Sequence, residues 1–246
     1  MTIRFKTDLK FLAIMLIFII AGLPVTVKAE NTRTLAERLG FSATDKVLII
    51  NADDAGLSFS TNKAVTESME QGLVTSASLM VPCAWFPQMA NYAKSHPTAD
   101  FGIHITLTSE WEGYRWSPLA DDRSDIRGLT DPAGYFWSST DQFLQHATPE
   151  EAEAEAREQI LTAHTAGIDI THLNSHMATL HLNAKYYAVY IRLAKEFDLP
   201  LRMPSQSFLE SIGMGHLRGQ LAKDGILCPD FLKFNAILCS KIHGNR

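Results

Sequence analysis

The chain has 246 residues, a length that one large domain or two small ones would fill. Hydrophobic residues make up 46% of it and charged residues 20%, so we expect a packed core and exclude wholesale disorder. The net charge is −5 at pH 7, and an acidic chain lacks the positive surface that nucleic-acid binding requires. The same charge argues, more weakly, against polyanionic substrates.

The first 29 residues have the pattern of a secretory signal peptide. Three basic side chains precede an apolar run at residues 11–21, and small residues ending at Ala29 suit cleavage. Because a membrane span needs roughly 20 apolar residues, this shorter run predicts removal and export to the periplasm or the outside of the cell. An uncleaved segment, lengthened by residues 23–27, would instead anchor the protein in the membrane. The segment carries a net charge of +3, so its removal would leave a domain of residues 30–246 with a net charge of −8. That domain would have no membrane anchor.

Three cysteines, Cys83, Cys228 and Cys239, are widely spaced in the chain. No Cys-x-x-Cys pair is present, which argues against a zinc site made of thiolates. Export permits one disulfide, but the spacing does not select a pair. We expect at least one of these cysteines to be buried and free.

Apolar and β-branched runs alternate with helical patterns after the first 29 residues. This alternation predicts strands joined by helices, and therefore a parallel β/α architecture. Ser58 is a helix-capping residue, and Thr148 with Glu151 has the spacing of a capping box. We interpret the glutamates of the helix after Thr148 as a solvated face without a catalytic role. We expect strands at residues 47–50, 74–81, 101–107, 168–173 and 199–203, and helices at residues 30–44, 58–72, 85–95, 148–167 and 183–197.

A pair of carboxylates, Asp53 and Asp54, follows the apolar run at residues 47–50. Charges at the end of a buried strand are costly unless a metal ion or a substrate proton uses them. Sites in α/β folds gather at the carboxyl ends of parallel strands, where we expect this pair. The alternative is a simple turn, because Asp and Gly are common turn residues. Neighbouring strand residues point to opposite faces, so both carboxylates reach one site only if the backbone bends after Ala52.

Histidines on two other predicted strands are candidate metal ligands. His104 lies in the strand at residues 101–107, and His172 and His176 lie near the next one, with His181 following. Imidazole nitrogens and a carboxylate oxygen suit zinc and similar divalent ions. Two histidines and one carboxylate leave positions open for water, as a hydrolytic metal site requires. The alternative for each histidine is a core side chain with a satisfied hydrogen bond.

A long stretch at residues 109–137 is mostly irregular and rich in aromatic side chains. Long loops in compact domains are usually functional or disordered, and the aromatic content argues against disorder. We assign Trp111, Tyr114 and Trp116 in this stretch, together with Arg202, to substrate binding, because exposed aromatic rings stack on sugar faces. The alternative is a loop that packs on the domain through its own aromatic rings.

Four segments resemble the signature of the YdjC-like, or ChbG/HpnK, carbohydrate deacetylases, and their order and spacing agree over about residues 46–205. The resemblance implies an α/β fold, an irregular, TIM-like β/α barrel of the polysaccharide-deacetylase-like type. It also implies metal-dependent removal of N-acetyl groups from amino-sugar oligosaccharides such as chitooligosaccharides. The four segments are residues 49–58 (IINADDAGLS), 72–81 (GLVTSASLMV), 102–108 (GIHITLT) and 171–177 (THLNSHM).

The resemblance also implies roles for individual residues. By the family pattern Asp54, His104 and His176 bind one divalent metal ion, with Mg²⁺ implied and Zn²⁺ as the alternative. Asp53 resembles the general base that takes a proton from the attacking water. The residues alone leave open which of the two carboxylates has which role.

The chain departs from the family pattern in several places. Asn174 stands where the family often has Asp, a histidine-rich run is replaced after His176, and Ala55 replaces a usual Phe. The family pattern also continues well beyond Arg246 and supplies another histidine there. A barrel without its last elements is open at one edge, so we expect either a poorly stable domain or one that completes itself as a homodimer.

Two other functions stay open from the sequence. One is a sugar-binding protein without turnover, which keeps the aromatic loop and the metal ligands but lacks the C-terminal elements. The other is a metal-dependent hydrolase of a different bond, such as a phosphoester. The acidic charge and the absence of a glycine-rich phosphate loop argue against the second.

Overall fold

The fold was obtained as a computed structural model, which describes residues 35–120 and 126–233. The predicted signal peptide and Cys239 lie outside these residues. Among the helices of the described part, none is long and apolar enough to cross a membrane.

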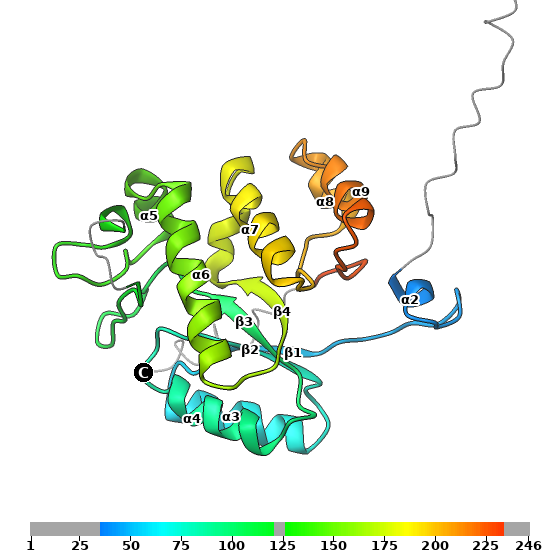
Figure 1. The fold of residues 1–246 in the computed structure, drawn as a ribbon, viewed down its shortest axis with the longest axis horizontal. Coiled ribbons are helices and arrows are strands. Elements are labelled where there is room, and N and C mark those ends of the chain that lie inside the picture. Colours follow the sequence, from blue (N-terminus) through cyan, green and yellow to red (C-terminus); the bar gives the residue numbers. More distant parts are fainter. Residues whose placement is uncertain (1–34, 121–125, 234–246) are drawn as a thin grey trace, which may run out of the picture.

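A parallel four-stranded sheet forms the centre of the molecule (Figure 1). Its strands are β1 (Asn51–Ala55), β2 (Ser76–Leu79), β3 (Phe101–Ile105) and β4 (Ile170–Ser175), and they neighbour one another in chain order. Each strand pairs in parallel with the next. Parallel neighbours need a crossover, and helices provide it, which confirms the predicted α/β architecture.

The four crossover and flanking helices begin where the sequence predicts. The side chain of Ser58 accepts from the Thr61 N–H at the start of α3, and Thr148 and Glu151 form the capping box of α6. Figure 1 shows α6 and α7 on one side of the strands and α3 and α4 on the other. The bounds are α3 (Phe59–Glu70), α4 (Phe86–Ser95), α6 (Pro149–Thr165) and α7 (Ala184–Phe197).

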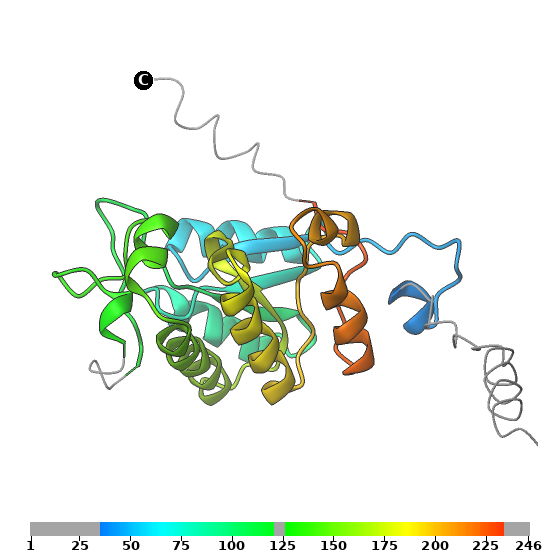
Figure 2. The same ribbon diagram turned by 90° about the horizontal axis from the view of Figure 1, so that it is seen from above.

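Shorter elements lie around this centre. Viewed from above, α5 and the loop before it lie at one end of the molecule, and α8 and α9 lie at the other (Figure 2). These elements are α2 (Leu35–Arg38), the 3₁₀ helix η1 (Arg127–Leu129), α5 (Thr140–His146), the 3₁₀ turns η2 (His176–His181), α8 (Gln206–Ser211) and α9 (His216–Lys223).

The first strand lies later in the chain than the sequence predicts. Residues 47–50 are outside β1, and their side chains are exposed. The carbonyl of Ile50 accepts from the backbone N–H groups of Thr75 and Ser76, so regular pairing with β2 begins only at Asn51. The prediction of a buried strand at residues 47–50 was therefore wrong. A hydrophobic run shows that burial is favoured but does not show which residues find a pairing partner.

The strand predicted at residues 199–203 is reduced to one bridge, in which Leu201 pairs in parallel with Leu173 of β4. The backbone N–H of Leu173 donates to Pro200, and that of Arg202 donates to Leu173, so this segment continues the sheet beside β4. The described strands form a parallel row, the arrangement from which β/α barrels are built.

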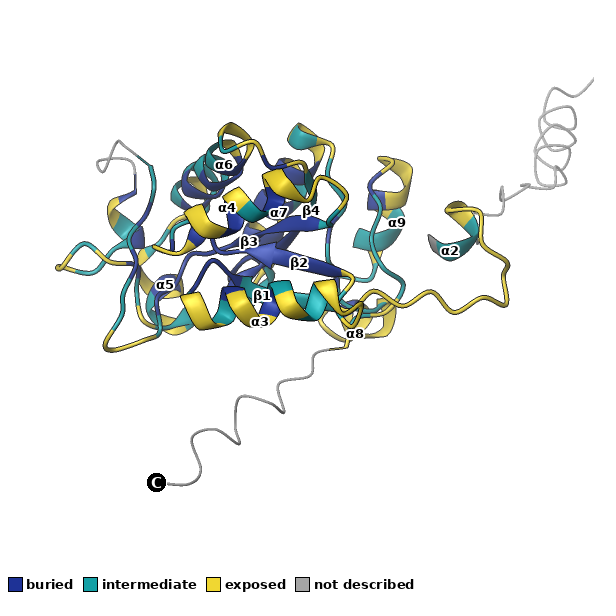
Figure 3. Cartoon of the chain, turned by 90° about the horizontal axis from the view of Figure 1, so that it is seen from below, coloured by how far each residue is buried: buried dark blue, intermediate teal, exposed yellow. Residues whose placement is uncertain are grey.

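The middle of the sheet is buried between its helices, and Figure 3 shows β2 and β3 dark blue beside the partly exposed α3 and α4. Every residue of β2 and β3 is buried. Two polar residues of α6, Glu155 and Gln159, lie in this core as well, and Glu155 accepts from the backbone N–H groups of Leu119 and Ala120. The prediction that all glutamates of this helix face solvent was wrong for Glu155.

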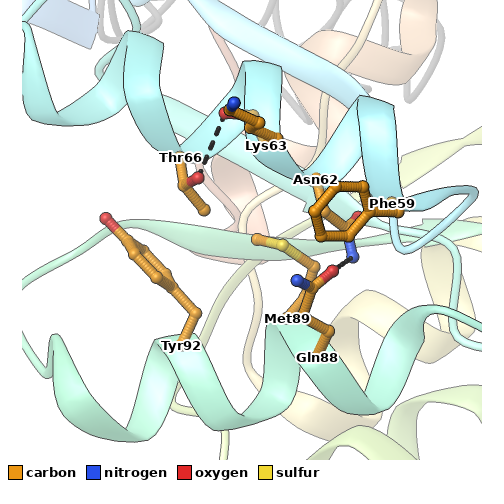
Figure 4. A pocket seen from close by; sticks show the side chains of 7 residues that line it. All are labelled: Phe59, Asn62, Lys63, Thr66, Gln88, Met89 and Tyr92. Carbon is orange, nitrogen blue, oxygen red and sulfur yellow. Dashed lines mark hydrogen bonds between the residues drawn. The ribbon is translucent and has the colours of Figure 1, made fainter.

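A polar contact joins α3 to α4 beside the carboxyl end of β1. The amide nitrogen of Asn62 donates to Gln88 Oε1 at 2.8 Å (Figure 4). It also donates to the Trp85 carbonyl at 3.0 Å. Its amide oxygen accepts from the Gly56 N–H at 2.6 Å. Asn62 therefore fixes the turn after β1 against the start of α4.

Candidate metal centre and active site

The backbone bends at the pair of carboxylates, as the sequence requires for both to serve one site. Between Ala52 and Ala55 of β1 the register with β2 shifts, so that Asp53 and Asp54 together oppose the single residue Ser78. Asp54 has a φ of +65°, in the left-handed region that non-glycine residues rarely adopt. Such a bulge re-aims side chains, and here it brings two successive carboxylates to the same side of the strand.

Three predicted metal ligands converge at the carboxyl ends of β1, β3 and β4. His104 Nε2 lies 3.1 Å from Asp54 Oδ1, and His176 Nδ1 lies 3.3 Å from the same oxygen. The two ring nitrogens are 3.2 Å apart. Ligands about 2.1 Å from a shared ion are separated by roughly 2.9 Å in octahedral and 3.4 Å in tetrahedral coordination. The three atoms therefore have the spacing of one metal coordination face.

The chemistry of these three groups also fits a cation. Asp54 Oδ1 is buried and makes no hydrogen bond of good geometry, although both ring nitrogens are close to it. Burial by itself would raise the pKa of Asp54, but the His104 and His176 rings outweigh it and hold that pKa well below its usual range. Burial would lower the pKa of His176, yet Asp54 and Glu110 raise it to about 9. A divalent ion would take the place of that proton.

Asp53 lies beside the three ligands in a dense set of hydrogen-bond donors. Its Oδ1 accepts from Asn51, Ser78, Asn174 and Arg202 at 2.6 to 3.0 Å, while Oδ2 accepts from Arg202 alone among the described contacts, at 2.8 Å. Burial would raise the pKa of Asp53, but the hydrogen bonds to Arg202 and the other donors lower it to about 2. Asp53 is therefore ionised, and Oδ2 is the oxygen with room for another donor.

Asn174 connects the metal ligands to Asp53. Its amide oxygen faces Nδ1 of His104, and its amide nitrogen donates to Asp53 Oδ1 at 2.9 Å and to Ser78 Oγ at 2.7 Å. A ligating histidine is normally held through its second nitrogen by such an acceptor. The amide at this position supplies both an acceptor for His104 and a donor for Asp53, which a carboxylate could not do.

Glu110 is a member of the site that the sequence reasoning missed. Its Oε2 lies 3.0 Å from His176 Nε2, on the edge of the ring opposite to the one that faces Asp54. It follows the Gly102–Thr108 motif by two residues, and that proximity was the only signal available in the sequence.

The aromatic loop reaches the same site, but its rings differ in exposure. Trp111 is 49% exposed, whereas Trp116 is only 3% exposed and donates from its indole nitrogen to the Thr108 carbonyl. Tyr114 packs between these two rings, and its hydroxyl accepts from the Ala84 N–H. The structure thus leaves the ring of Trp111 open for stacking, while the buried ring of Trp116 packs toward His176.

Other candidate residues lie elsewhere. His172 pairs with Asp100 at 3.6 Å near the opposite end of β4, and His181 is enclosed by the rings of Tyr187 and Tyr190. Arg202, predicted to bind substrate, has its guanidinium on Asp53. Cys83 is buried and free, as expected for at least one cysteine, and Cys228 is also free.

The family model for YdjC-like proteins matches residues 47–237 of this chain. The chain belongs to the YdjC-like family. Its Asp–Asp, His104 and His176 segments all fall within the matched residues, so the resemblance drawn from those motifs is confirmed.

Similar proteins include two described as carbohydrate deacetylases. One, from Brevibacillus brevis, is 38% identical over 157 residues, which cover 64% of this chain and 59% of the relative. The other, from Thermus thermophilus, is 37% identical over 180 residues, which cover 73% of this chain and 61% of the relative. The chain thus spans about three fifths of the length of these curated relatives.

A solved structure with the same fold is that of a protein from Enterococcus faecalis V583, which is described as a candidate cellobiose-phosphate cleavage protein. It superposes with a TM-score of 0.64 at 29% identity and covers 76% of this chain and 67% of its own. This likeness confirms the predicted fold class, an α/β fold of the YdjC-like type.

Proposed function

We propose that this protein is a metal-dependent hydrolase that removes N-acetyl groups from an amino-sugar oligosaccharide. The observation that carries the proposal is the triangle of Asp54 Oδ1, His104 Nε2 and His176 Nδ1, with the ionised Asp53 beside it. Relatives in the same family are described as carbohydrate deacetylases, which supports a sugar amide as the substrate class.

Asp54, His104 and His176 would hold the ion. When bound, a divalent ion supplies a coordinated water of lowered pKa and polarises the acetamide carbonyl. The donor set of two imidazoles and one carboxylate is typical of zinc and similar ions, whereas the family resemblance implies magnesium. Both metals therefore belong in the first assay.

Asp53 is the residue that moves the proton. Its Oδ2 accepts a proton from the attacking water as the new C–O bond forms at the acetamide carbon. Arg202 holds both oxygens of Asp53, so that the carboxylate keeps a fixed direction. Breaking the C–N bond then gives acetate, and the amine nitrogen takes up both protons of the water, one of them by way of Asp53, to leave as an ammonium group.

Trp111 and Tyr114 would hold the sugar. The exposed face of Trp111 suits stacking on a pyranose ring, and Tyr114 lies between it and the buried Trp116. Trp116 then acts as support for this platform rather than as a stacking face. We further propose that the protein works after export, as the pattern of residues 1–29 indicates.

Acetate release from N-acetylated oligosaccharides tests the proposal most simply. The wild-type protein, loaded with Mg²⁺ or Zn²⁺, should release acetate, and Asp53→Asn should reduce the rate by roughly 100-fold or more while metal content stays near wild type. Glu112→Gln, an exposed carboxylate on the aromatic loop, serves as the matched control. Binding of the sugar without acetate release would instead support a protein that binds carbohydrate without turnover.

A further inference from the structure

We infer that Glu110 is a positioning residue that fixes which nitrogen of His176 faces the metal ion. Its carboxylate accepts the Nε2–H of His176, so the ring presents the lone pair of Nδ1 toward Asp54 and His104. The inference rests on the metal site of the proposed function and adds a residue and a ligating atom to it.

Geometry assigns the two edges of the His176 ring to different partners. Nε2 lies 3.0 Å from Glu110 Oε2, while Nδ1 lies 3.3 Å from Asp54 Oδ1 and 3.2 Å from His104 Nε2. A nitrogen that donates a proton to a carboxylate has no lone pair for a metal, so only Nδ1 is left as the ligand. His176 is 8% exposed, which leaves little space for water to replace Glu110.

Packing alone does not select this orientation. The His176 ring meets the rings of His104 and Trp116 at centroid distances of 5.0 and 6.4 Å. An imidazole turned by half a turn about its Cβ–Cγ bond occupies nearly the same volume, so these contacts tolerate both orientations. The hydrogen bond to Glu110 is the contact that distinguishes them.

Placing the Glu110 carboxylate at this position costs hydration free energy unless a partner compensates for it. Its Oε1 is buried and makes no hydrogen bond of good geometry with the described residues, so this oxygen has given up its hydration. His176 compensates for part of that loss through Oε2. A carboxylate that is desolvated and directed at a ligand histidine has the usual form of outer-shell support in metal sites.

The formal charge of the site also matches that of one divalent ion only when Glu110 is included. Asp53, Asp54 and Glu110 carry three negative charges, and Arg202 carries one positive charge, which gives −2 with both histidines neutral. One divalent ion neutralises this set. His104 is held by the neutral amide of Asn174, so the charged acceptor is used on His176 alone.

Titration of the chelator-treated full chain with Zn²⁺ alone and with Mg²⁺ alone tests the role by isothermal calorimetry. Glu110→Ala should weaken the tighter of the two metals by roughly 10- to 100-fold, and Glu110→Gln, which keeps an acceptor oxygen but no charge, by about 10-fold. Glu112→Ala should stay within about twofold of wild type, because its carboxylate is exposed on the same loop.

Ring nitrogen spectra separate positioning from a general structural effect. In the Zn²⁺-loaded wild type, a long-range ¹H–¹⁵N spectrum should show His176 protonated at Nε2, and in Glu110→Gln both nitrogens should show partial protonation. Wild-type affinity in both Glu110 variants with an unchanged His176 pattern would overturn the inference. If the wild type binds neither metal, or if His104→Ala binds metal as the wild type does, the result contradicts the metal site of the proposed function itself. If Glu110→Ala does not fold, Glu110→Gln decides.

Discussion

The guanidinium of Arg202 donates to both carboxylate oxygens of Asp53, at 2.6 and 2.8 Å, across 149 residues of sequence. Arg202 lies beside β4 and Asp53 lies in the bulge of β1, so this contact joins the two outer edges of the described sheet. A planar fork that engages both oxygens fixes the direction of the carboxylate as well as its charge.

Arg202→Lys tests that directional role. Lysine keeps the positive charge but offers one donor group in place of the fork, so Asp53 should lose its fixed orientation. We expect acetate release to fall by roughly 10- to 100-fold with metal content unchanged, as measured by initial rates and metal analysis. Arg192→Lys, on the exposed face of α7, is the control and should leave the rate as in wild type. An unchanged rate in Arg202→Lys would show that charge alone suffices.

Asn174→Ala should affect metal binding and turnover together. The change removes the acceptor that faces His104 and the donor that reaches Asp53. We expect metal affinity to fall by roughly 10-fold, and the rate at saturating metal to fall as well. Calorimetry and rate measurements on the same preparation check both. A loss of rate with full metal affinity would mean that Asn174 supports Asp53 only.

The convergence of Asp54, His104 and His176 and the parallel architecture could be predicted from the sequence, whereas the positions of the groups around them could not. Asp54 and His104 lie near the carboxyl ends of β1 and β3, and His176 directly follows β4, so their convergence follows from topology. Glu110 and Arg202 lie in irregular segments, where no periodicity indicates direction. Their contacts depend on the folded path of the chain.

The errors of prediction have the same origin. The apolar residues 47–50 were expected to form a buried strand, but pairing starts at Asn51, where the partner backbone of β2 begins. Glu155 was expected in solvent from its position in a glutamate-rich helix, but the folded loop brings the N–H groups of Leu119 and Ala120 to it. In both cases a distant segment, absent from any local pattern, decides the outcome.

Glu155 should make the stability of the domain depend on pH. Burial raises the pKa of Glu155 to about 7, and the hydrogen bonds from Ala120, Gln159 and Leu119 offset burial only in part. Because its pKa in the folded state exceeds the unfolded value, its contribution to stability is fully present below about pH 4.3 and is lost as pH rises through about 7.

Comparison of wild type with Glu155→Gln isolates this group, since other titrating groups are shared. Between pH 5 and pH 8 the free energy of unfolding of wild type should fall by about 2 kcal/mol relative to the variant, measured by urea denaturation. Glu150→Gln, an exposed position on the same helix, should show no such difference. Parallel pH profiles for wild type and Glu155→Gln would contradict the assigned shift.

Asn62→Ala should destabilise the turn that follows β1, the strand that contains Asp54. The change removes the side chain that accepts from the Gly56 N–H and donates to the Trp85 carbonyl. It also removes the hydrogen bond to Gln88 that Figure 4 shows. We expect a loss of about 1 to 3 kcal/mol in the free energy of unfolding, measured by urea denaturation. Asn91→Ala, an exposed asparagine of α4, is the control. A loss no larger than that of the control would mean that Asn62 is dispensable.

Metal stoichiometry of the purified protein tests the central claim most directly. Elemental analysis after dialysis should find one divalent ion per wild-type chain, and His104→Ala and His176→Ala should each lose the ion together with acetate release, because the three ligand atoms form a single coordination face. Exposed Glu112→Ala should retain both the ion and the activity. Stoichiometric metal in both histidine variants would contradict the assignment of Asp54, His104 and His176 as the metal centre.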